Sequence, residues 1–292
     1  MSNIHKIYSF FFHFLGYPTD DPTEWKEYRR IMTETMDTGF ENFQKKLNEM
    51  YDYKPNGEYR RHHFFNISPH LNIYQYPQEL DYDYATDNLP KCCNVDAFIR
   101  TDSRPFNELP DEFKPENLKD NQKLLYLSMG SMGGYDLKMM TRLIEILSKC
   151  KHKIIVAKGP LGEQYELPSN MWGKNILPQT QILPLVDLVL THGGNNTVTE
   201  SFFYGKPMII LPLFADQYDN GQRVQEKKFG FRIDPYRTTE KELLDAIDNL
   251  LNDDDLKDRL TKARKRIMSS DSKDKACIQI EEMVENYQEK SF

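Results

Sequence analysis

In the second half of the chain, short apolar runs alternate with segments whose apolar residues have helical spacing. Continuous apolar runs such as Lys123–Ser128 alternate with segments such as Asp136–Ser148, in which apolar residues recur every three or four positions. Short apolar runs of this kind predict strands, and apolar residues at helical spacing predict helices. Strands and helices that alternate in this way predict a parallel sheet with crossover helices.

The same alternation extends to the end of the chain. Further strands are expected at Leu188–Leu190, Pro207–Leu211 and Phe231–Ile233, and within the run KIIVAKGP that begins at Lys153. Further helices are expected at Thr197–Tyr204, Asp216–Lys228, Thr239–Leu251, Asp253–Ile267 and Lys273–Tyr287, the third of them capped by Thr238 or Thr239. About six strands in this arrangement predict a Rossmann-like, doubly wound domain that binds its ligand at the carboxyl ends of the strands.

The first part of the chain has a different pattern. Trp25–Met50 has helical periodicity, whereas Tyr51–Asp111 is rich in Pro, Tyr, Asp and Asn and leaves room for one or two helices and two strands. Asp102–Asn117 carries three prolines and dense charge, which is typical of a linker between domains. We therefore expect residues 1–113 to form a partial domain and linker, and residues 114–292 to form a complete domain.

Composition narrows the classes of partner. Lys and Arg total 38 and Asp and Glu total 45, which gives a net charge of −7. A chain with this charge is not expected to have the basic field that holds nucleic acid. No apolar run approaches the ~18 residues of a membrane span, and the apolar segment Ile7–Leu15 lacks the small-residue cleavage site of a signal peptide. The four cysteines show no C-x-x-C spacing. A cytoplasmic protein without a membrane span is expected.

One junction between a strand and a helix has the features of an anion site. His192 follows a hydrophobic strand, the Gly193–Gly194 pair permits a tight turn, and a helix is expected to begin at Asn196 or Thr197. Free N–H groups and the helix dipole favour a phosphate there, and His192, Asn196 and Thr197 add side-chain donors. Glu200, one turn into the helix, is placed to accept hydrogen bonds from a ribose diol.

A second junction follows at PLFADQYDN, from Pro212 to Asn220. Asp216 and Gln217 begin the next helix there, so a carboxylate and an amide suited to sugar hydroxyls are expected at the same edge of the sheet. Asp is also a preferred residue at helix starts, so a capping role for Asp216 is an equally good interpretation from the local pattern.

Together these segments resemble the donor-binding signature of the UDP-dependent glycosyltransferases of the GT-B fold. The shared elements are P-Q at Pro178, H-G-G-x-N-T-x-x-E beginning thirteen positions after Gln179, then G-x-P, P-L-F-A-D-Q and a following Asn. The short spacing between P-Q and the His is similar to that of macrolide-type and some arthropod members of the family. The resemblance extends more loosely from about Leu71 to the C-terminus. It implies an α/β protein of GT-B type, with a complete Rossmann-like donor domain and a partial acceptor domain.

The resemblance also implies roles for individual residues, with a UDP-sugar as donor substrate and neither a metal nor a cofactor. The positions it assigns to the UDP diphosphate are Gly130, Ser131, His192, Gly194, Asn196 and Thr197. It assigns uracil and ribose to Leu177, Gln179 and Glu200, and the sugar to Asp216 and Gln217. One departure is Ile176, which stands where many relatives have a Trp that stacks on uracil; Trp172 is nearby but out of register.

The family's catalytic base is a His in an early loop of the acceptor domain, and no residue here matches its context. The five histidines of the N-terminal part are expected to be structural or exposed: His5, His13, His62, His63 and His70. The adjacent pairs His62–His63 and Cys92–Cys93 point to opposite faces of an extended chain, which argues against shared metal ligation. The catalytic residue is therefore left unassigned.

These observations lead to one principal hypothesis and two alternatives. The principal one is transfer of a hexose from a UDP-sugar to a small lipophilic hydroxyl acceptor, with inversion. The first alternative is a catalytically inactive, UDP-sugar-binding truncated isoform or pseudoenzyme, which pairs with a full-length relative. The second is a GT-B epimerase, which the Asp216–Gln217 pattern disfavours.

Overall fold

The computed structural model describes residues 68, 70–81, 92–99 and 106–289, with scattered positions between 27 and 52. The described residues between 27 and 51 are helical, in agreement with the helix expected at Trp25–Met50. The apolar side chains that predicted that helix, and His5, His13, His62 and His63, lie outside the described residues.

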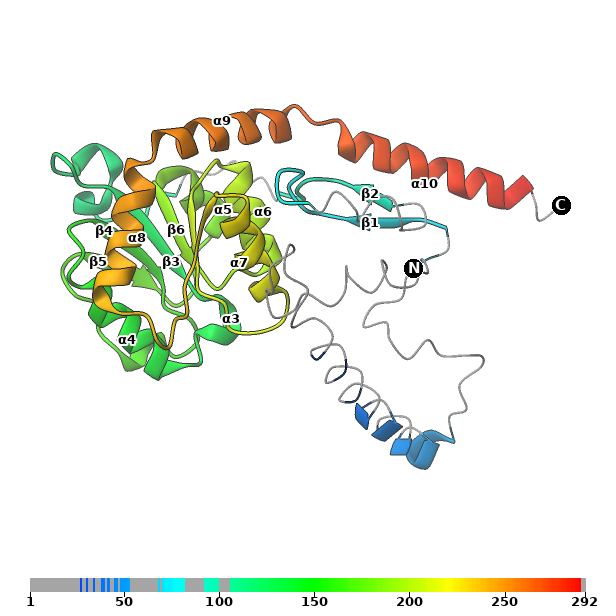
Figure 1. Ribbon diagram of the computed structural model, residues 1–292, viewed down its shortest axis with the longest axis horizontal. Coiled ribbons are helices and arrows are strands. Elements are labelled where there is room, and N and C mark those ends of the chain that lie inside the picture. The colour runs from blue at the N-terminus through cyan, green and yellow to red at the C-terminus, as the bar shows by residue number, and fades with distance from the viewer. Residues whose placement is uncertain are drawn as a thin grey trace.

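A six-stranded parallel sheet forms the centre of the main domain (Figure 1). Its strands are β3 (Leu124–Ser128), β4 (Lys153–Ala157), β5 (Met171–Lys174), β6 (Leu188–Thr191), β7 (Met208–Ile210) and β8 (Gly230–Arg232). The spatial order is β5-β4-β3-β6-β7-β8. From β3 the chain first adds strands on one side, β4 and β5, and then returns to add β6, β7 and β8 on the other side, so that β3 and β6 are parallel neighbours. This is the order of a doubly wound Rossmann sheet, so the expected fold class is confirmed.

Helices connect the strands and continue to the C-terminus. They are α3 (Gly130–Gly133), α4 (Leu137–Leu147), α5 (Gln179–Ile182), α6 (Asn195–Phe203), α7 (Asp216–Glu226), α8 (Glu240–Asn252), α9 (Asp254–Met268) and α10 (Ser272–Glu289). Single 3-10 turns lie at η1 (Asp111–Phe113), η2 (Pro115–Asn117), η3 (Gly162–Gln164) and η4 (Leu183–Leu185). No helix in the described part of the chain combines the length and apolar character needed to cross a membrane.

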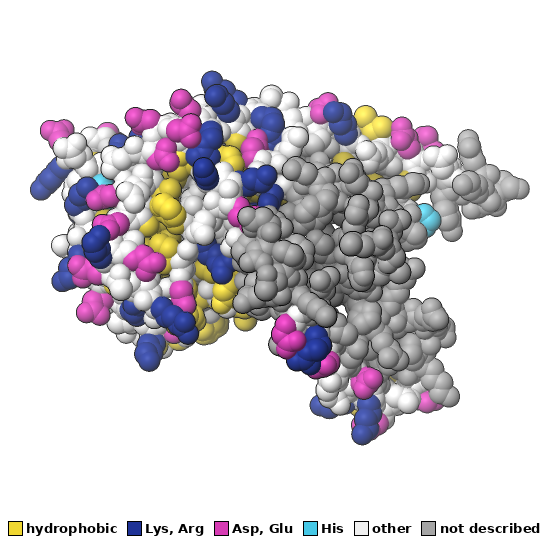
Figure 2. All heavy atoms as spheres, in the orientation of Figure 1, with side chains coloured by type: hydrophobic (Ala, Val, Ile, Leu, Met, Phe, Trp, Pro, Cys, Tyr) yellow, Lys and Arg dark blue, Asp and Glu magenta, His cyan; other side chains and the backbone are white. Residues whose placement is uncertain are grey.

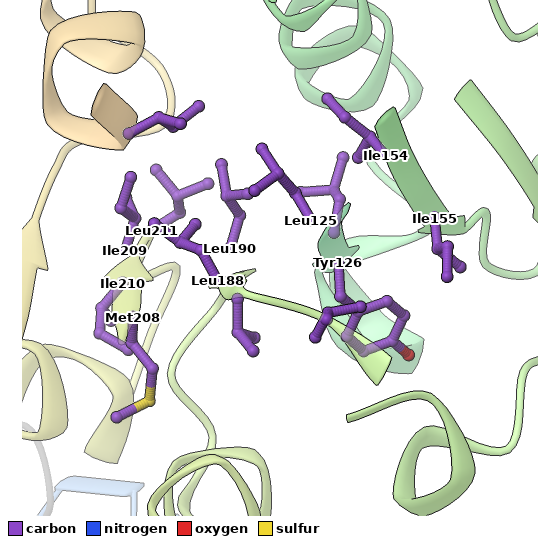
Figure 3. Packing of buried hydrophobic residues seen from close by; sticks show 14 of the residues in the cluster. Leu125, Tyr126, Ile154, Ile155, Leu188, Leu190, Met208, Ile209, Ile210 and Leu211 are labelled. Atoms are coloured by element: carbon purple, nitrogen blue, oxygen red, sulfur yellow. The ribbon is translucent and has the colours of Figure 1, made fainter. Parts of the chain in front are cut away.

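The central strands are buried because their side chains are apolar on both faces. Every residue of β3, β6 and β7 is buried, and Figure 3 shows their side chains packed together with those of β4. On the surface, basic and acidic side chains are interspersed over the face of the main domain in Figure 2. Neither sign of charge dominates the part of the main domain that is visible in this view.

Helix ends follow the expected capping chemistry. Thr239 caps α8 in a capping box with Glu242, and Asp253 caps α9 by accepting from the backbone N–H of Leu256. Two details differ from expectation. The loop expected after β3 contains the single helical turn α3, and the strand β5 was not predicted individually.

The segment before the main domain consists of β1 (Asn72–Tyr74) and β2 (Cys92–Asn94), which pair in parallel. We call residues 70–81 and 92–99 the β1–β2 segment. Helix α10 runs beside it, where Ala276 packs against Cys93 and Val95 (Figure 1). The four cysteines are all described and all free.

Two arginines attach the β1–β2 segment to the main domain. Arg223 of α7 donates to the backbone carbonyls of Leu80 at 2.8 Å and Asp81 at 2.7 Å. Arg266 of α9 makes a bidentate pair with Glu79, at 2.7 Å for each bond, and donates to Asp96 at 2.7 Å. The segment is therefore held by charge-assisted hydrogen bonds that are buried at Arg223–Leu80 and part-buried elsewhere.

The proposed linker packs closely on the main domain along part of its length. Phe113, in η1, is buried in the same core as the sheet, and the Lys153 ammonium lies 4.6 Å from its ring centroid. Leu109 is buried in that core as well. The boundary at residues 113/114 stays a prediction, and the packing shows that residues just before it contribute to the core of the main domain.

His152 is a buried titratable group that makes stability depend on pH. It is 3% exposed, and its Nδ1 accepts from the Lys123 N–H at 3.1 Å. Burial, then the Lys151 charge, lowers the pKa of His152, and the Asp248 and Asp187 carboxylates oppose that shift. The unfolded chain therefore binds a proton at higher pH than the native state does, and stability should fall as pH drops below about 6.5.

We expect His152→Asn to flatten part of that fall, because its side-chain oxygen can keep the bond to the Lys123 N–H without titrating. The measurement is the free energy of unfolding in urea between about pH 7 and about pH 5. Exposed His70→Asn is the control and should leave the profile unchanged. An equally steep profile in His152→Asn would show that other groups cause the pH dependence.

Candidate functional site

The site lies at the carboxyl ends of β3 and β6, where the strand order reverses. Ser128 and Thr191, the last residues of these strands, are paired in register. The chain beyond them carries Gly130 and Ser131 on one side and His192 on the other. Two predicted phosphate-binding loops, more than 60 residues apart in sequence, therefore meet at the position where doubly wound sheets bind ligands.

The imidazole of His192 is enclosed by two glycines. A Cβ at Gly130 would lie 2.7 Å from His192 Nε2, and a Cβ at Gly194 would lie equally close, at 2.7 Å. Gly130 also has a φ of +68°, which side chains rarely adopt, whereas Gly194 has an ordinary φ of −59°. The glycines thus make the space in which the ring sits.

His192 lies where its ring can donate a hydrogen bond to an anion. Burial lowers the pKa of His192, and a hydrogen bond with the Ser128 backbone and the charge of Asp216 oppose that shift. The Nδ1 atom lies 3.2 Å from Thr191 Oγ1. A neutral imidazole has a single N–H, and a bond to the Ser128 backbone uses it, so donation to a diphosphate requires the protonated ring, which the negative charge of the diphosphate itself favours.

Asp216 connects the two strand-to-helix junctions. Its Oδ2 accepts from the Asn195 N–H at 3.2 Å and from Asn220 Nδ2 at 3.3 Å, and Asn220 Nδ2 also donates to the Gly193 carbonyl at 2.8 Å. Helix α7 does begin at Asp216, as expected, but its N-cap is Ala215 and has no side-chain cap. The carboxylate instead meets the first turn of the neighbouring helix α6.

Helix α6 begins at Asn195, slightly earlier than the expected Asn196 or Thr197, because Gly194 serves as its N-cap. Thr197 is buried and accepts from Gln179 Nε2 at 3.2 Å. The same Gln179 nitrogen donates to Glu200 Oε2 at 2.6 Å. Three residues predicted to surround the diphosphate and ribose are thus brought together in one hydrogen-bonded group.

Gln217 lies beside Asp216 but uses part of its amide internally. It is 3% exposed, and its Oε1 accepts from the backbone N–H groups of Leu213 at 2.9 Å and Phe214 at 3.2 Å. These bonds shape the loop that leads into α7. A sugar would therefore be recognised through the Nε2 end of Gln217, and its sugar-binding role stays a prediction.

The expected uracil position has an aliphatic, exposed surface. Leu177 is buried, whereas Ile176 is 88% exposed just before α5. Trp172 does not substitute for the missing aromatic residue, because it lies within β5 and its ring packs against Phe106 at a centroid distance of 6.2 Å. Ile176 is therefore the exposed apolar side chain at the position that the resemblance assigns to uracil stacking.

Ala215 has a strained backbone at the edge of the site, with φ +53° and ψ −137°. This conformation favours glycine and costs other residues about 1–3 kcal/mol. Glycine relieves this strain, but it also stabilises the unfolded chain by about 0.5–1 kcal/mol because it raises the conformational entropy of that state. We therefore expect Ala215→Gly to raise the free energy of unfolding by about 1 kcal/mol. Urea denaturation measures the change.

The matched control is Ala263→Gly, within the helical backbone of α9. It should lower the free energy of unfolding by about 1–2 kcal/mol, because glycine is a poor helix former and the buried methyl group of Ala263 is lost. A loss of stability in Ala215→Gly as large as that in Ala263→Gly would contradict strain at Ala215.

Three contributions to the site were not assigned from the sequence. Asn195 and Asn220 bond to Asp216, and Gln75 of the β1–β2 segment bonds to Asn196. Asn220 belongs to the quoted signature, which is a usable signal, whereas nothing in the local sequence marks Gln75. In the described part of the chain, no group of three or more His, Cys, Asp or Glu residues could hold a metal ion.

Comparison with known proteins identifies the family to which the chain belongs. The sequence profile of the family described as "UDP-glucoronosyl and UDP-glucosyl transferase" matches residues 31–275. The chain belongs to this UDP-glycosyltransferase family, as the signature around His192 predicted.

Individual relatives agree with this assignment. The chain is 29% identical to the "Uncharacterized UDP-glucosyltransferase YdhE" of Bacillus subtilis over 181 residues, covering 61% of this chain and 44% of that protein. It is 26% identical to human UDP-glucuronosyltransferase 1A9 over 209 residues, covering 67% of this chain and 37% of that protein. The chain thus spans less than half the length of these two relatives.

Solved structures show the same fold. The glycosyltransferase of kitacinnamycin superposes with a TM-score of 0.67 at 21% identity, covering 89% of this chain and 67% of that one. The calicheamicin glycosyltransferase CalG4 superposes with a TM-score of 0.58 at 18% identity, covering 85% of this chain and 61% of that one. The GT-B type expected from the resemblance is therefore confirmed.

Proposed function

We propose that this chain binds a UDP-sugar at the carboxyl ends of β3 and β6 and that it serves the transfer of a hexose to a small lipophilic hydroxyl acceptor, with inversion. The observation that carries the proposal is the convergence of His192, the start of α6 and the Gln179–Glu200 pair on one edge of the sheet. It offers donors for a diphosphate beside a carboxylate for a ribose diol.

In the proposed reaction, the acceptor oxygen forms a bond to the anomeric carbon as the bond from that carbon to the diphosphate breaks. Negative charge then develops on the leaving diphosphate. The His192 ring and the N–H groups in the first turn of α6 beyond Asn195 are placed to stabilise that charge. The base that takes the acceptor proton is not assigned to a residue of this chain.

The second candidate is a non-catalytic UDP-sugar-binding protein that pairs with a full-length relative. Its support comes from the histidines that the structure describes. His192 is enclosed in the donor site, His152 precedes β4 at the opposite edge of the sheet, and His70 is exposed in the β1–β2 segment. None of these three is placed as a base opposite the donor site. The cytoplasmic location stays a prediction under both candidates.

Two measurements test the proposals. Calorimetric titration with UDP tests the shared claim of donor binding, and failure of the wild-type chain to bind UDP would remove both candidates. Incubation with UDP-glucose or UDP-glucuronic acid and a panel of phenols and terpenoid alcohols separates them. Glycoside formation by the purified chain would exclude the non-catalytic candidate, whereas UDP binding without turnover would favour it.

Recognition of ribose by Glu200 gives a sharper prediction. Glu200 Oε2 is held by Gln179 Nε2 at 2.6 Å, which restricts the position of the carboxylate. We expect wild-type chain to bind UDP about tenfold more tightly than 2′-deoxy-UDP, because a hydrogen bond to a charged group contributes about 1.5–3 kcal/mol. Glu200→Ala should bind both nucleotides equally, as measured by calorimetry. Retained discrimination in Glu200→Ala would assign the ribose to another residue.

A further inference from the structure

Gln75 connects the β1–β2 segment to the first turn of α6. Its Oε1 accepts from the Phe98 N–H at 2.9 Å, and its Nε2 donates to Asn196 Oδ1 at 2.6 Å. Its backbone carbonyl accepts from Asn195 Nδ2 at 3.1 Å. One residue is thus held between the end of β2 and two asparagines that lie more than a hundred positions later in the chain.

The order of donors along this connection fixes the orientation of two amides. A backbone N–H can only donate, so Phe98 requires the oxygen of the Gln75 amide to face it. The Gln75 nitrogen then faces Asn196, which must offer its oxygen in return. The Asn196 nitrogen is consequently turned away from Gln75 and remains a donor.

We infer that Gln75 is a positioning residue for the donor diphosphate. It holds Asn196 so that the amide nitrogen, rather than the oxygen, is presented to the phosphate. Asn196 is exposed and could otherwise rotate to present either end. The inference rests on the proposed function, and it deepens that function by making the β1–β2 segment part of the donor site.

Two substitutions of Gln75 test whether the residue orients Asn196 or only supports the fold. Gln75→Glu keeps an acceptor for the Phe98 N–H but cannot donate to Asn196. The Asn196 nitrogen is then expected to turn toward the new carboxylate, leaving an oxygen and an added negative charge near the phosphate. We expect the Kd for UDP to rise about tenfold or more. Gln75→Met removes the connection without adding charge and should raise the Kd about threefold to fivefold.

The affinity for uridine, which lacks the diphosphate, distinguishes a positioning role of Gln75 from a role in folding. Uridine affinity, followed by NMR at millimolar concentration, should stay within about twofold in both variants. In an Asn196→Ala background, Gln75→Met should cause no further loss of UDP affinity, because the residue through which it acts is gone. Gln122→Glu makes the same charge change before β3, at the opposite edge of the sheet, and should leave the Kd for UDP unchanged.

Each outcome decides the inference. If wild-type chain binds UDP and both Gln75 variants bind it equally well, the inference is overturned and the proposed function stands. A parallel loss of UDP and uridine binding would show a merely structural role for Gln75 and would also overturn it. If wild-type chain binds neither UDP nor pyrophosphate, the proposed function fails and this inference fails with it.

Discussion

Gly194→Ala is expected to weaken UDP binding as much as His192→Ala does, by about thirtyfold, although it adds only a methyl group. The added Cβ would lie 2.7 Å from His192 Nε2, so the ring must move out of its position. The backbone at Gly194 has a φ of −59° and accepts alanine without strain. Loss of one hydrogen bond to a charged group corresponds to about 1.5–3 kcal/mol, or roughly tenfold to a hundredfold in Kd.

The double variant that combines His192→Ala with Gly194→Ala is the strictest test of this prediction. Once His192 is alanine, the methyl group at Gly194 has no ring to displace, so the double variant should bind UDP as weakly as either single variant and no more weakly. Calorimetry with UDP measures all four proteins. Gly39→Ala is the matched control, because a Cβ at Gly39 would meet no atom within 4 Å. Additive losses in the double variant would show that Gly194 acts independently of His192.

The sequence predicts the main domain well because its signals are local. Parallel strands such as β3 and β6 consist of continuous apolar residues, and caps such as Thr239 lie within three residues of their partners. β5 was harder to predict, because it is a short edge strand whose sequence MWGK combines a glycine and a lysine with two apolar residues. Only its pairing with β4 makes it a strand.

The site could be predicted where one motif supplies several residues, and not where distant segments meet. The run from His192 to Glu200 places the diphosphate and ribose residues on one turn and helix. In contrast, the partners of Asp216 could not be inferred, since its local pattern equally suits a cap of its own helix. Gln75 is the extreme case, because its role depends on how the β1–β2 segment packs against α6. Side-chain partners that are far apart in sequence leave no periodic signal.

The attachment of the β1–β2 segment is another such long-range feature, and it carries the largest expected effect on stability. Arg223 lies on α7 with 5% exposure, and its guanidinium satisfies the carbonyls of Leu80 and Asp81. Removing the side chain leaves these acceptors unsatisfied and creates space beside Leu80, which is fully buried. We expect Arg223→Ala to lower the free energy of unfolding by about 3 kcal/mol, within the range for disrupted buried charged hydrogen bonds.

Arg223→Lys should recover only part of this loss, because an ammonium cannot reproduce the planar fork that reaches two carbonyls. Arg237→Ala is the control: Arg237 is 88% exposed in its pair with Asp234, and its loss should change stability by less than about 0.5 kcal/mol. Urea denaturation measures stability, and hydrogen exchange at β1 and β2 reports attachment. Because Gln75 follows β1 directly, Arg223→Ala should also weaken UDP binding. Faster exchange at β1 and β2 with unchanged UDP affinity would separate the attachment of this segment from the donor site.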